Sequence, residues 1–211
     1  MAAFLYGPVH GFMLWNLFLA AIPAVLALAL FPSSRCPGLR VPSSKFGPPA
    51  RRGVGWWLGL TAWVLFLPNA PYLLTDVVHM VHDIQRASSD TRAYLVIVTY
   101  GALFACGLAS YALSLQLFRR FLHRTVEARL VAPTILLVHA LCVLAMYLGR
   151  FVRLNSWDVL VAPGEVLSSV LRVPRPTTVV VLGIMFVVVG AGVFVTLAIA
   201  DKVFARARRL L

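Results

Sequence analysis

The sequence predicts an all-α, polytopic membrane protein, a bundle of about five transmembrane helices. Of its 211 residues, 61% are hydrophobic and only 12% are charged, whereas roughly one quarter of the residues of a soluble domain are charged. Its apolar runs are about 20 residues long, which suits a spanning helix rather than the ~10 alternating residues of a barrel strand. Since lipid offers no hydrogen-bond partner to a bare peptide group, helices are the expected spanning structure.

Each of the five predicted spans is an apolar run above the ~18 residues that a spanning helix needs. They cover residues 11–31, 54–74, 93–118, 131–151 and 178–200 of a single transmembrane domain, residues 1–211. No Lys or Arg precedes the first run, and basic residues follow it. This order favours a retained span with its N-terminus outside over a cleaved signal peptide. The segment 32–53 is basic and rich in Pro, Ser and Gly, so we expect an irregular cytoplasmic loop.

The formal charge of +12 predicts an orientation rather than a nucleic-acid partner. Most of the 19 basic residues lie in segments 35–52, 119–129 and 202–209, which share one side if the spans alternate. That side is the cytoplasm by the positive-inside rule, so the C-terminus is predicted to be cytoplasmic. Basic and aromatic residues are not interleaved as in a single-strand binder. The expected partners are therefore the bilayer and anionic lipid headgroups.

Small residues recur at helical spacing in two of the spans. Gly101, Ala105 and Ala109 share a face of the third span, and Gly192 and Ala200 share a face of the fifth. Small residues allow helices to approach closely in a membrane. Helix–helix association is therefore a further expectation.

The stretch LPNAPYLLTDVVHMVHD, residues 67–83, begins near the outer end of the second predicted span. Pro68 and Pro71 lack an N–H and disfavour α geometry in the residues before them, which predicts a break at residues 67–71. Asn69 is predicted to cap the N-terminus of a new short helix, with Pro71 in its first turn. The alternative is that Asn69 and freed carbonyl groups form a polar binding site at membrane depth.

Two acids and two histidines follow the predicted break. If the helix resumes at residue 72, Asp76, His79 and Asp83 share one face at positions i, i+3 and i+7, with His82 beside it. These residue types bind zinc and other divalent ions, so Asp76, His79 and Asp83 are a candidate metal site. Contact with water and headgroups is the alternative. Asp76 and His79, with Asp158, are also candidate acid–base residues.

The fourth span ends in LGRFVRLNSWDVL, residues 148–160, with Arg150 and Arg153 one turn apart at its outer end. Arginines there commonly extend toward headgroup phosphates. Facing acids of the second span, they alternatively form ion pairs or a pocket for an anionic group. Asn155 is a candidate helix cap and a candidate ligand-binding residue. The segment that follows, through residue 171, is predicted to lie on the outer surface as an amphipathic segment, kinked near Pro163.

Two further polar residues lie within predicted spans. Asn16 lies one to two turns below the outer end of the first span, where an amide is expected to hydrogen-bond to another helix or to join the polar site. His139 falls near the middle of the fourth span. An ionisable residue at that depth is a functional candidate, and a neutral imidazole bonded to a neighbouring hydroxyl or carbonyl group is the structural alternative.

Three motifs of the sequence resemble those of a known family. They are WNLFLAAIP, FLPNAPYLLTDVVHM and LGRFVRLNSWDVL, at residues 15–23, 66–80 and 148–160. On these residues the chain resembles the bacterial membrane proteins grouped as domain of unknown function 1361, which implies a bacterial inner-membrane location and no assigned activity. The residues that match the family's motifs are Asn16, Pro68, Asn69, Pro71, Tyr72, Asp76, His79, Arg150, Arg153, Asn155, Trp157 and Asp158. Members often carry another helix ahead of the WN motif, so a missing N-terminal helix is an open alternative.

Three functions remain open at this level. The first is an enzyme or metal-assisted site at the outer face that acts on a lipid or cell-envelope precursor, with Arg150 and Arg153 holding phosphate. The second is a non-catalytic membrane component in which the motif residues tie the first, second and fourth spans together. The third is a small-solute transporter that uses the broken helix, although few ionisable residues lie deep in the spans to form a pathway.

Overall fold

The computed structural model describes residues 8–31, 53–154, 158–173 and 175–210, and every regular element among them is a helix. Five stretches are long and apolar enough to cross a membrane. These are Met13–Leu30, Val54–Gln85, Asp90–Thr125, Ala128–Val152 and Pro176–Val203. The predicted all-α membrane fold is therefore confirmed. Almost all of the loop predicted at residues 32–53 lies outside the described residues.

The helices follow one another in a simple order along the chain. They are α2 (Pro8–Leu30), α3 (Val54–Phe66), α4 (Asn69–Tyr72), the 3-10 turn η1 (Leu73–Asp76), α5 (Val77–Gln85), α6 (Asp90–Thr125), α7 (Ala128–Tyr147), the π-helical turn η2 (Leu148–Val152), α8 (Asp158–Val161), α9 (Pro163–Leu171) and α10 (Pro176–Leu210). The predicted outer segment is thus two short helices, α8 and α9, that meet at Ala162.

The second span differs most from its predicted length. Helical structure continues past residue 74 to Gln85, so the break lies near the middle of this stretch and not at its outer end. The continuation, α5, has apolar residues on more than one side: Met80 and Ile84 pack against α6, whereas Val77 and Val78 are exposed. Charged residues among them end the apolar run, so a prediction based on the length of that run misses this part of the helix.

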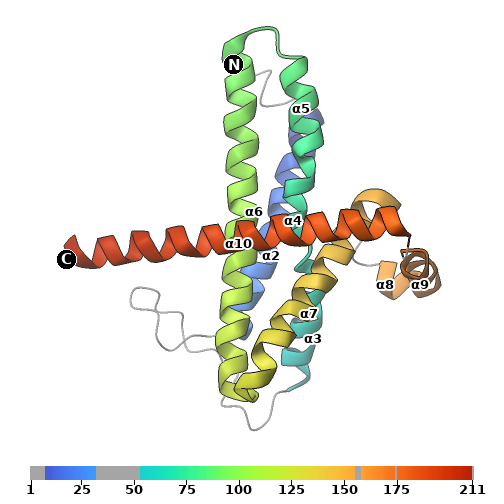
Figure 1. Cartoon of the computed structure of the whole chain (residues 1–211), viewed down its shortest axis with the longest axis vertical. Helices are drawn as coiled ribbons and strands as arrows, with labels where there is room; N and C mark the ends of the chain where they lie inside the picture. The colour runs from blue at the N-terminus through green and yellow to red at the C-terminus, as the bar shows by residue number, and fades with distance from the viewer. Residues whose placement is uncertain (1–7, 32–52, 155–157, 174, 211) are drawn as a thin grey trace.

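The bundle is organised around the long helix α6 (Figure 1). α5 lies along one half of α6, α3 and α7 lie at the other half, and α2 passes both halves, with Met13 packed on the half that α5 covers. α2 packs more extensively on α6 than on α3. At that contact Ala20 is buried, and Ser110 Oγ of α6 donates a hydrogen bond of 2.6 Å to its carbonyl oxygen.

An aromatic cluster fills the core between α2, α3 and α6. The ring of Phe31 lies edge-on to Trp63, with centroids 5.2 Å apart, and Trp63 lies 4.9 Å from Phe118. Phe31 and Trp63 are fully buried. Offset and edge-on aromatic pairs add stability beyond the area they bury. This cluster holds the lower half of the bundle together and so fixes the start of the broken helix.

Helix α10 packs across α6 and α7 with a large angle between the helix axes, instead of running parallel to them (Figure 1). His139 of α7 joins the three helices: its Nδ1 lies 2.9 Å from the Tyr111 hydroxyl and its Nε2 lies 3.1 Å from the Phe186 carbonyl oxygen. A carbonyl only accepts, so Nε2 carries the proton and Nδ1 accepts from Tyr111. His139 is therefore bonded to a neighbouring hydroxyl group and to a carbonyl group, as its structural alternative predicted. Gly190 of α10 lets that helix lie close to the His139 ring, because a Cβ at Gly190 would lie only 3.4 Å from His139 Nε2.

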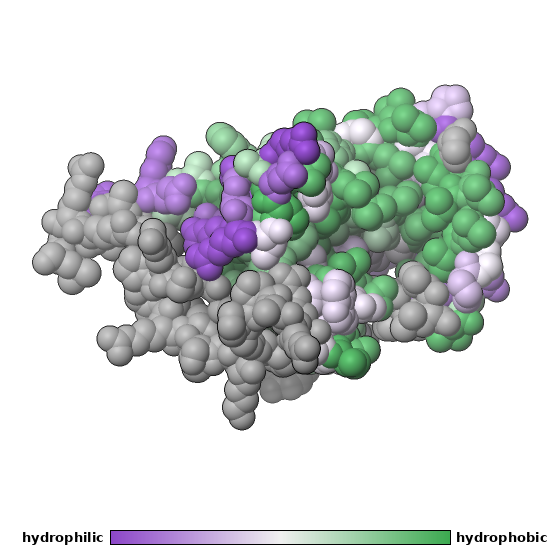
Figure 2. All heavy atoms as spheres, turned by 90° about the horizontal axis from the view of Figure 1, so that it is seen from below, coloured by the Kyte–Doolittle hydropathy of each residue, from purple (hydrophilic) through white to green (hydrophobic). Residues whose placement is uncertain are grey.

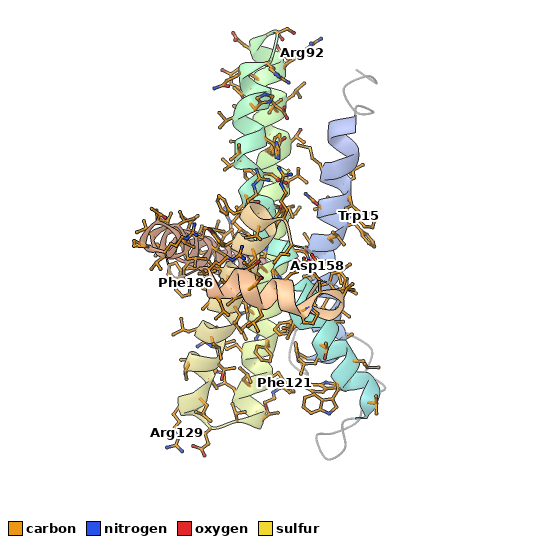
Figure 3. All side chains as sticks on the ribbon, turned by 90° about the vertical axis from the view of Figure 1, so that its right-hand side faces the viewer. Trp15, Arg92, Phe121, Arg129, Asp158 and Phe186 are labelled. Carbon is orange, nitrogen blue, oxygen red and sulfur yellow. The ribbon has the colours of Figure 1, made fainter. Side chains whose placement is uncertain are left out.

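The outer surface of the described residues suits lipid. Seen from the end at which α6 and α7 meet, the surface is largely hydrophobic, with separate groups of hydrophilic side chains (Figure 2). Arg92 and Arg129 lie at opposite ends of the long axis, and Trp15 points away from the neighbouring helices between them (Figure 3). Exposed apolar residues are abundant on α10 in particular. A surface of this kind is stable only in an apolar solvent.

Candidate functional site

The break in the second span follows from its two prolines. In a regular helix the Leu67 carbonyl would accept the N–H of residue 71, which Pro71 lacks. It instead accepts the Ala70 N–H at 3.3 Å, which leaves the Phe66 carbonyl without a backbone donor. Asn69 Nδ2 donates to that carbonyl oxygen at 3.1 Å. The predicted break is confirmed.

The predicted role of Asn69 at this break is wrong. We expected its side chain to accept a hydrogen bond from the helix that follows, as an N-cap does. The N-cap position of α4 is Pro68 and Asn69 is the first residue of that helix, and the Asn69 side-chain amide donates to the end of the preceding helix. The reason is that a carbonyl oxygen without a hydrogen bond in an apolar environment destabilises the fold more than a one-turn helix without an N-cap bond does.

Helix α6 holds the break in place through Gly107. A Cβ at Gly107 would lie only 2.5 Å from the carbonyl oxygen of Ala70 and 3.3 Å from the Cβ of Leu73. The backbones of α6 and α4 therefore approach as closely as a residue without a side chain allows. This contact fixes the direction in which the chain continues toward Asp76.

Beyond the break, Asp76 is the centre of a polar cluster built from three segments. Its side chain is 6% exposed. Asn16 Nδ2 of α2 donates to Oδ2 at 3.4 Å, and Arg150 Nη1 of η2 lies 3.7 Å from Oδ1 and 3.5 Å from His79 Nε2. We call Asn16, Asp76, His79 and Arg150 the Asp76 cluster. A buried carboxylate requires such partners, because its desolvation is costly.

The cluster confirms two predictions about polar contacts. Asn16 does hydrogen-bond to another helical segment, and Arg150 does form an ion pair with an acid of the second span. Arg150 is 21% exposed, and its guanidinium lies between Asp76 and His79. Arg150 is thus already engaged within the protein.

The third predicted metal ligand lies elsewhere. Tyr100 OH of α6 donates to Asp83 Oδ2 at 2.8 Å, and exposed His82 lies 3.9 Å from Asp83 Oδ1. Asp76 and Asp83 are seven residues apart, which separates them by about 10 Å along a helix even on one face, whereas zinc ligands lie ~2 Å from the ion. No group of three His, Cys, Asp or Glu side chains suited to a metal occurs within the described ranges. The predicted three-residue site is therefore not assembled.

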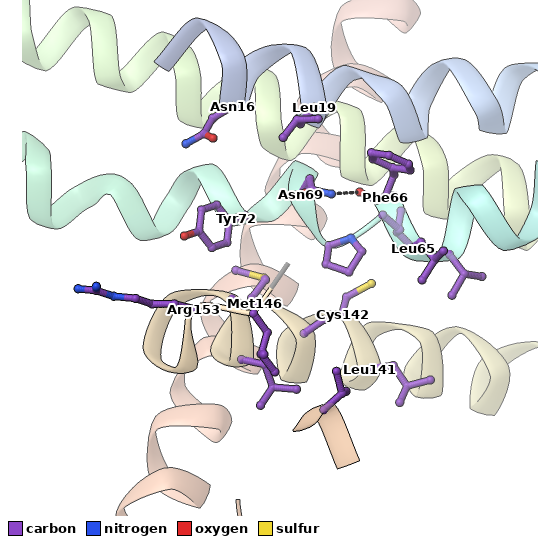
Figure 4. A pocket seen from close by; sticks show the side chains of 18 of the residues that line it. Asn16, Leu19, Leu65, Phe66, Asn69, Tyr72, Leu141, Cys142, Met146 and Arg153 are labelled. Carbon is purple, nitrogen blue, oxygen red and sulfur yellow. Dashed lines mark hydrogen bonds between the residues drawn. The ribbon is translucent and has the colours of Figure 1, made fainter. Parts of the chain in front are cut away.

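A pocket of about 660 Å³ lies beside the cluster. Its walls come from α2, the α3–α4 break, α7 with η2, and α9, and most of its lining side chains are apolar. Asn16, Tyr72 and Arg153 lie toward one end, and Leu65 and Phe66 lie toward the other (Figure 4). This size falls within the range of small-molecule sites. The pocket therefore has an apolar body and a polar end.

Asn16 connects the pocket to the cluster, because it lines the pocket and also bonds to Asp76. Asp76, His79 and Arg150 do not line it. Asp158 begins α8, after the arginine-bearing turn, and is half-buried. Asn155 lies outside the described residues. Of the predicted ligand-binding residues, the pocket thus brings together Asn16, Asn69 and Arg153.

Arg153 has an unusual backbone conformation. The π-helical turn η2 ends at Arg153, whose φ of 64° and ψ of 31° are left-handed, and no other non-glycine residue among those described has a positive φ. The Leu148 carbonyl accepts both the Arg153 N–H and the Leu154 N–H, the latter at 3.3 Å. Glycine favours this conformation, and another residue pays about 1 kcal/mol or more for it. π-helical turns and such outliers occur preferentially at functional sites.

Tyr72, Gly107 and Gly149 contribute to the site but carried no predicted ligand-binding role. Gly149 lets η2 lie against the Tyr72 ring, since a Cβ there would meet Cε2 at 3.4 Å. The signal for Tyr72 was its position one turn after Asn69, which puts both on one face. Nothing local marks the two glycines, because their role depends on a helix distant in sequence.

A family model described as "Protein of unknown function (DUF1361)" matches residues 15–191. No curated protein and no solved structure matches the chain.

Proposed function

Because this chain belongs to the DUF1361 family of unknown function, we propose a function from its site: the protein binds a lipid or another amphiphilic cell-envelope precursor. The apolar chain of the ligand occupies the body of the pocket, and its head lies at the end lined by Asn16, Tyr72 and Arg153. The single observation that carries this proposal is the division of one pocket into an apolar body and a polar end. A small polar solute would leave the apolar body unused.

The surroundings of the pocket support an amphiphile from the bilayer. The five apolar helices make lipid the medium around the protein. Trp15 lines the pocket and is also 56% exposed, so the pocket wall is continuous with the lipid-facing surface. An amphiphile can therefore enter from the membrane with its chain surrounded by apolar groups throughout.

We also propose that the polar end faces the non-cytoplasmic side of a bacterial cytoplasmic membrane. The excess of basic residues in segments 35–52, 119–129 and 202–209 supports this orientation. Asp76 and Arg150 each follow the inner start of their helices, Val54 and Ala128, by about 20 residues, or ~30 Å at 1.5 Å per residue. Asp76 and Arg150 thus lie about one hydrocarbon thickness along the chain from the starts of their helices, which supports their placement near the opposite membrane surface.

Within this proposal Asp76 and His79 are positioning residues. Both contact Arg150 and neither lines the pocket, so they hold η2 in place rather than touch the ligand. Chemistry on the bound head would need Asp158 or a group that approaches after binding.

Filling the pocket tests the proposal directly. Ala145 lines the pocket, whereas Ala140 on the same helix is exposed and does not. We expect Ala145→Phe to lose lipid that the full-length protein retains through purification, and Ala140→Phe to retain it, with native mass spectrometry as the measurement. Equal lipid retention by the two variants would overturn the proposal, and so would a parent protein that carries no lipid when extracted in mild detergent.

A second function is favoured by the Asp76 cluster itself: a non-catalytic membrane component stabilised by polar contacts between helices. Asn16, Asp76 and Arg150 join three segments distant in sequence. On this alternative Asp76→Asn lowers the thermal stability of the purified protein, and Ala145→Phe leaves its cellular phenotype intact. A phenotype lost with Ala145→Phe in a protein as stable as Ala140→Phe would exclude it.

A further inference from the structure

We propose that the head of the bound amphiphile carries a phosphate group and that Arg153, not Arg150, is the arginine that recognises it. This inference rests on the proposed function and specifies its ligand. Sequence alone treats Arg150 and Arg153 as an equivalent pair, but the structure separates them. Arg150 is held between Asp76 and His79, whereas no acidic side chain among the described residues pairs with Arg153, which lines the pocket.

The backbone at Arg153 gives an independent reason. A helix end with a left-handed residue is normally completed by glycine at no steric cost. Here the residue is arginine, whose side chain does not stabilise this backbone conformation. The conformation turns the chain after η2, and the exposed Arg153 side chain extends outward at the end of the pocket where Asn16 and Tyr72 also lie (Figure 4). The side chain is therefore available for a contact outside the backbone.

The chemistry of that contact follows from the groups available. A guanidinium offers a planar fork of donors that matches phosphate or carboxylate, and phosphate is the common anion of lipid heads. Asn16 and Tyr72 add uncharged groups at the same end, which suits an anion with several oxygen atoms. The apolar body next to Arg153 requires that the phosphate be attached to an apolar chain. We therefore commit to a lipid phosphate and not to free phosphate.

Two lipids with identical acyl chains test this assignment: phosphatidic acid, which has a terminal phosphate, and diacylglycerol, which lacks it. Binding of each to the purified full-length protein is measured by native mass spectrometry in detergent. We expect the parent to prefer phosphatidic acid by about tenfold or more, the factor that one charge-assisted interaction of ~1.5 kcal/mol supplies. Arg153→Gln should reduce this preference to less than about threefold and leave diacylglycerol binding unchanged.

Arg153→Gly separates recognition from folding, because glycine relieves the left-handed strain. This variant should lose the preference for phosphatidic acid while its melting temperature equals or exceeds that of the parent. The matched control is Arg172→Gln, an exposed arginine at a helix end with a relaxed φ of −85°, which should keep the parent preference.

Three outcomes would overturn the assignment. They are an unchanged preference in Arg153→Gln, an equal loss in Arg172→Gln, and displacement of phosphatidic acid by millimolar inorganic phosphate, which would indicate a site for free anions. If both lipids bind every arginine variant equally but not Ala145→Phe, the pocket proposal stands and only the role of Arg153 fails. If neither lipid binds the parent, the pocket proposal fails as well.

Discussion

Replacing Gly107 with alanine should destabilise the protein, whereas the same replacement at Gly101 of the same helix should stabilise it. The added Cβ at Gly107 would lie 2.5 Å from the backbone oxygen of Ala70 and 3.3 Å from Leu73 Cβ. Neither atom is the end of a flexible side chain, so α6 and α4 must separate. Overpacking of this kind costs about 1–3 kcal/mol. Nothing lies within 4 Å of a Cβ at Gly101.

The two variants share the intrinsic gain of glycine to alanine in a helix, about 0.5–1 kcal/mol. Gly101→Ala should therefore gain that amount, and Gly107→Ala should show a net loss of up to about 2.5 kcal/mol. For a chain of this size each 1 kcal/mol of loss lowers the melting temperature by about 2–4 °C. Thermal unfolding in mild detergent, followed by tryptophan fluorescence, measures both. A shift in the same direction for both variants would refute the close contact between α6 and the break.

Three other substitutions test the polar contacts in the same assay. Asn69→Ala leaves the Phe66 carbonyl without its side-chain donor and should cost about 1–3 kcal/mol. His139→Leu removes the nitrogen acceptor of the buried Tyr111 hydroxyl and leaves it only the weaker thiol of Cys142 as a partner, with an expected cost of about 1–2 kcal/mol. Arg150→Met leaves a buried carboxylate without its cation and should cost about 2–4 kcal/mol, of which Asp76→Leu in the same chain should restore a large part.

Exposed residues provide the controls: a histidine and an arginine match His139 and Arg150, and Thr61, whose hydroxyl donates to the Trp57 carbonyl oxygen, is compared with Asn69. Thr61→Ala on α3, His123→Leu on α6 and Arg172→Met after α9 all alter exposed side chains, so each should change stability by less than about 0.5 kcal/mol. An equal loss in a control and its test variant would mean that the effect comes from changed surface composition. A double variant at residues 76 and 150 that loses the sum of the single losses would show that the two groups do not interact.

Much of the fold could be predicted because its determinants are local. Each spanning stretch contains a long apolar run, and the break needs only the missing N–H groups of Pro68 and Pro71. The extension to Gln85 was missed because α5 mixes charged and apolar residues and is stabilised by packing on α6. The steep crossing of α10 was missed for a similar reason: it depends on His139 and Gly190, which meet only in the folded chain.

The candidate site was predictable in composition but not in arrangement. The expected depths of Asn16 and Arg150 in the bilayer predicted that both lie near the polar part of the second span, and both contact Asp76 there. The separation of Asp83 from Asp76 follows from helix rise, which a shared face does not reveal. The left-handed conformation of Arg153 has no sequence signal, since glycine or asparagine is the usual marker of that conformation.

The contact between α2 and α6 bears on the order of assembly. The first span packs on α3, α4 and η1 of the second span and also on the third span, whose Ser110 bonds to the carbonyl oxygen of the buried Ala20. During synthesis the first two spans therefore meet before the third has been made, when Ala20 still lacks the Ser110 hydroxyl and the break still lacks the surface at Gly107. The third span thus completes a contact that the first two spans have already begun.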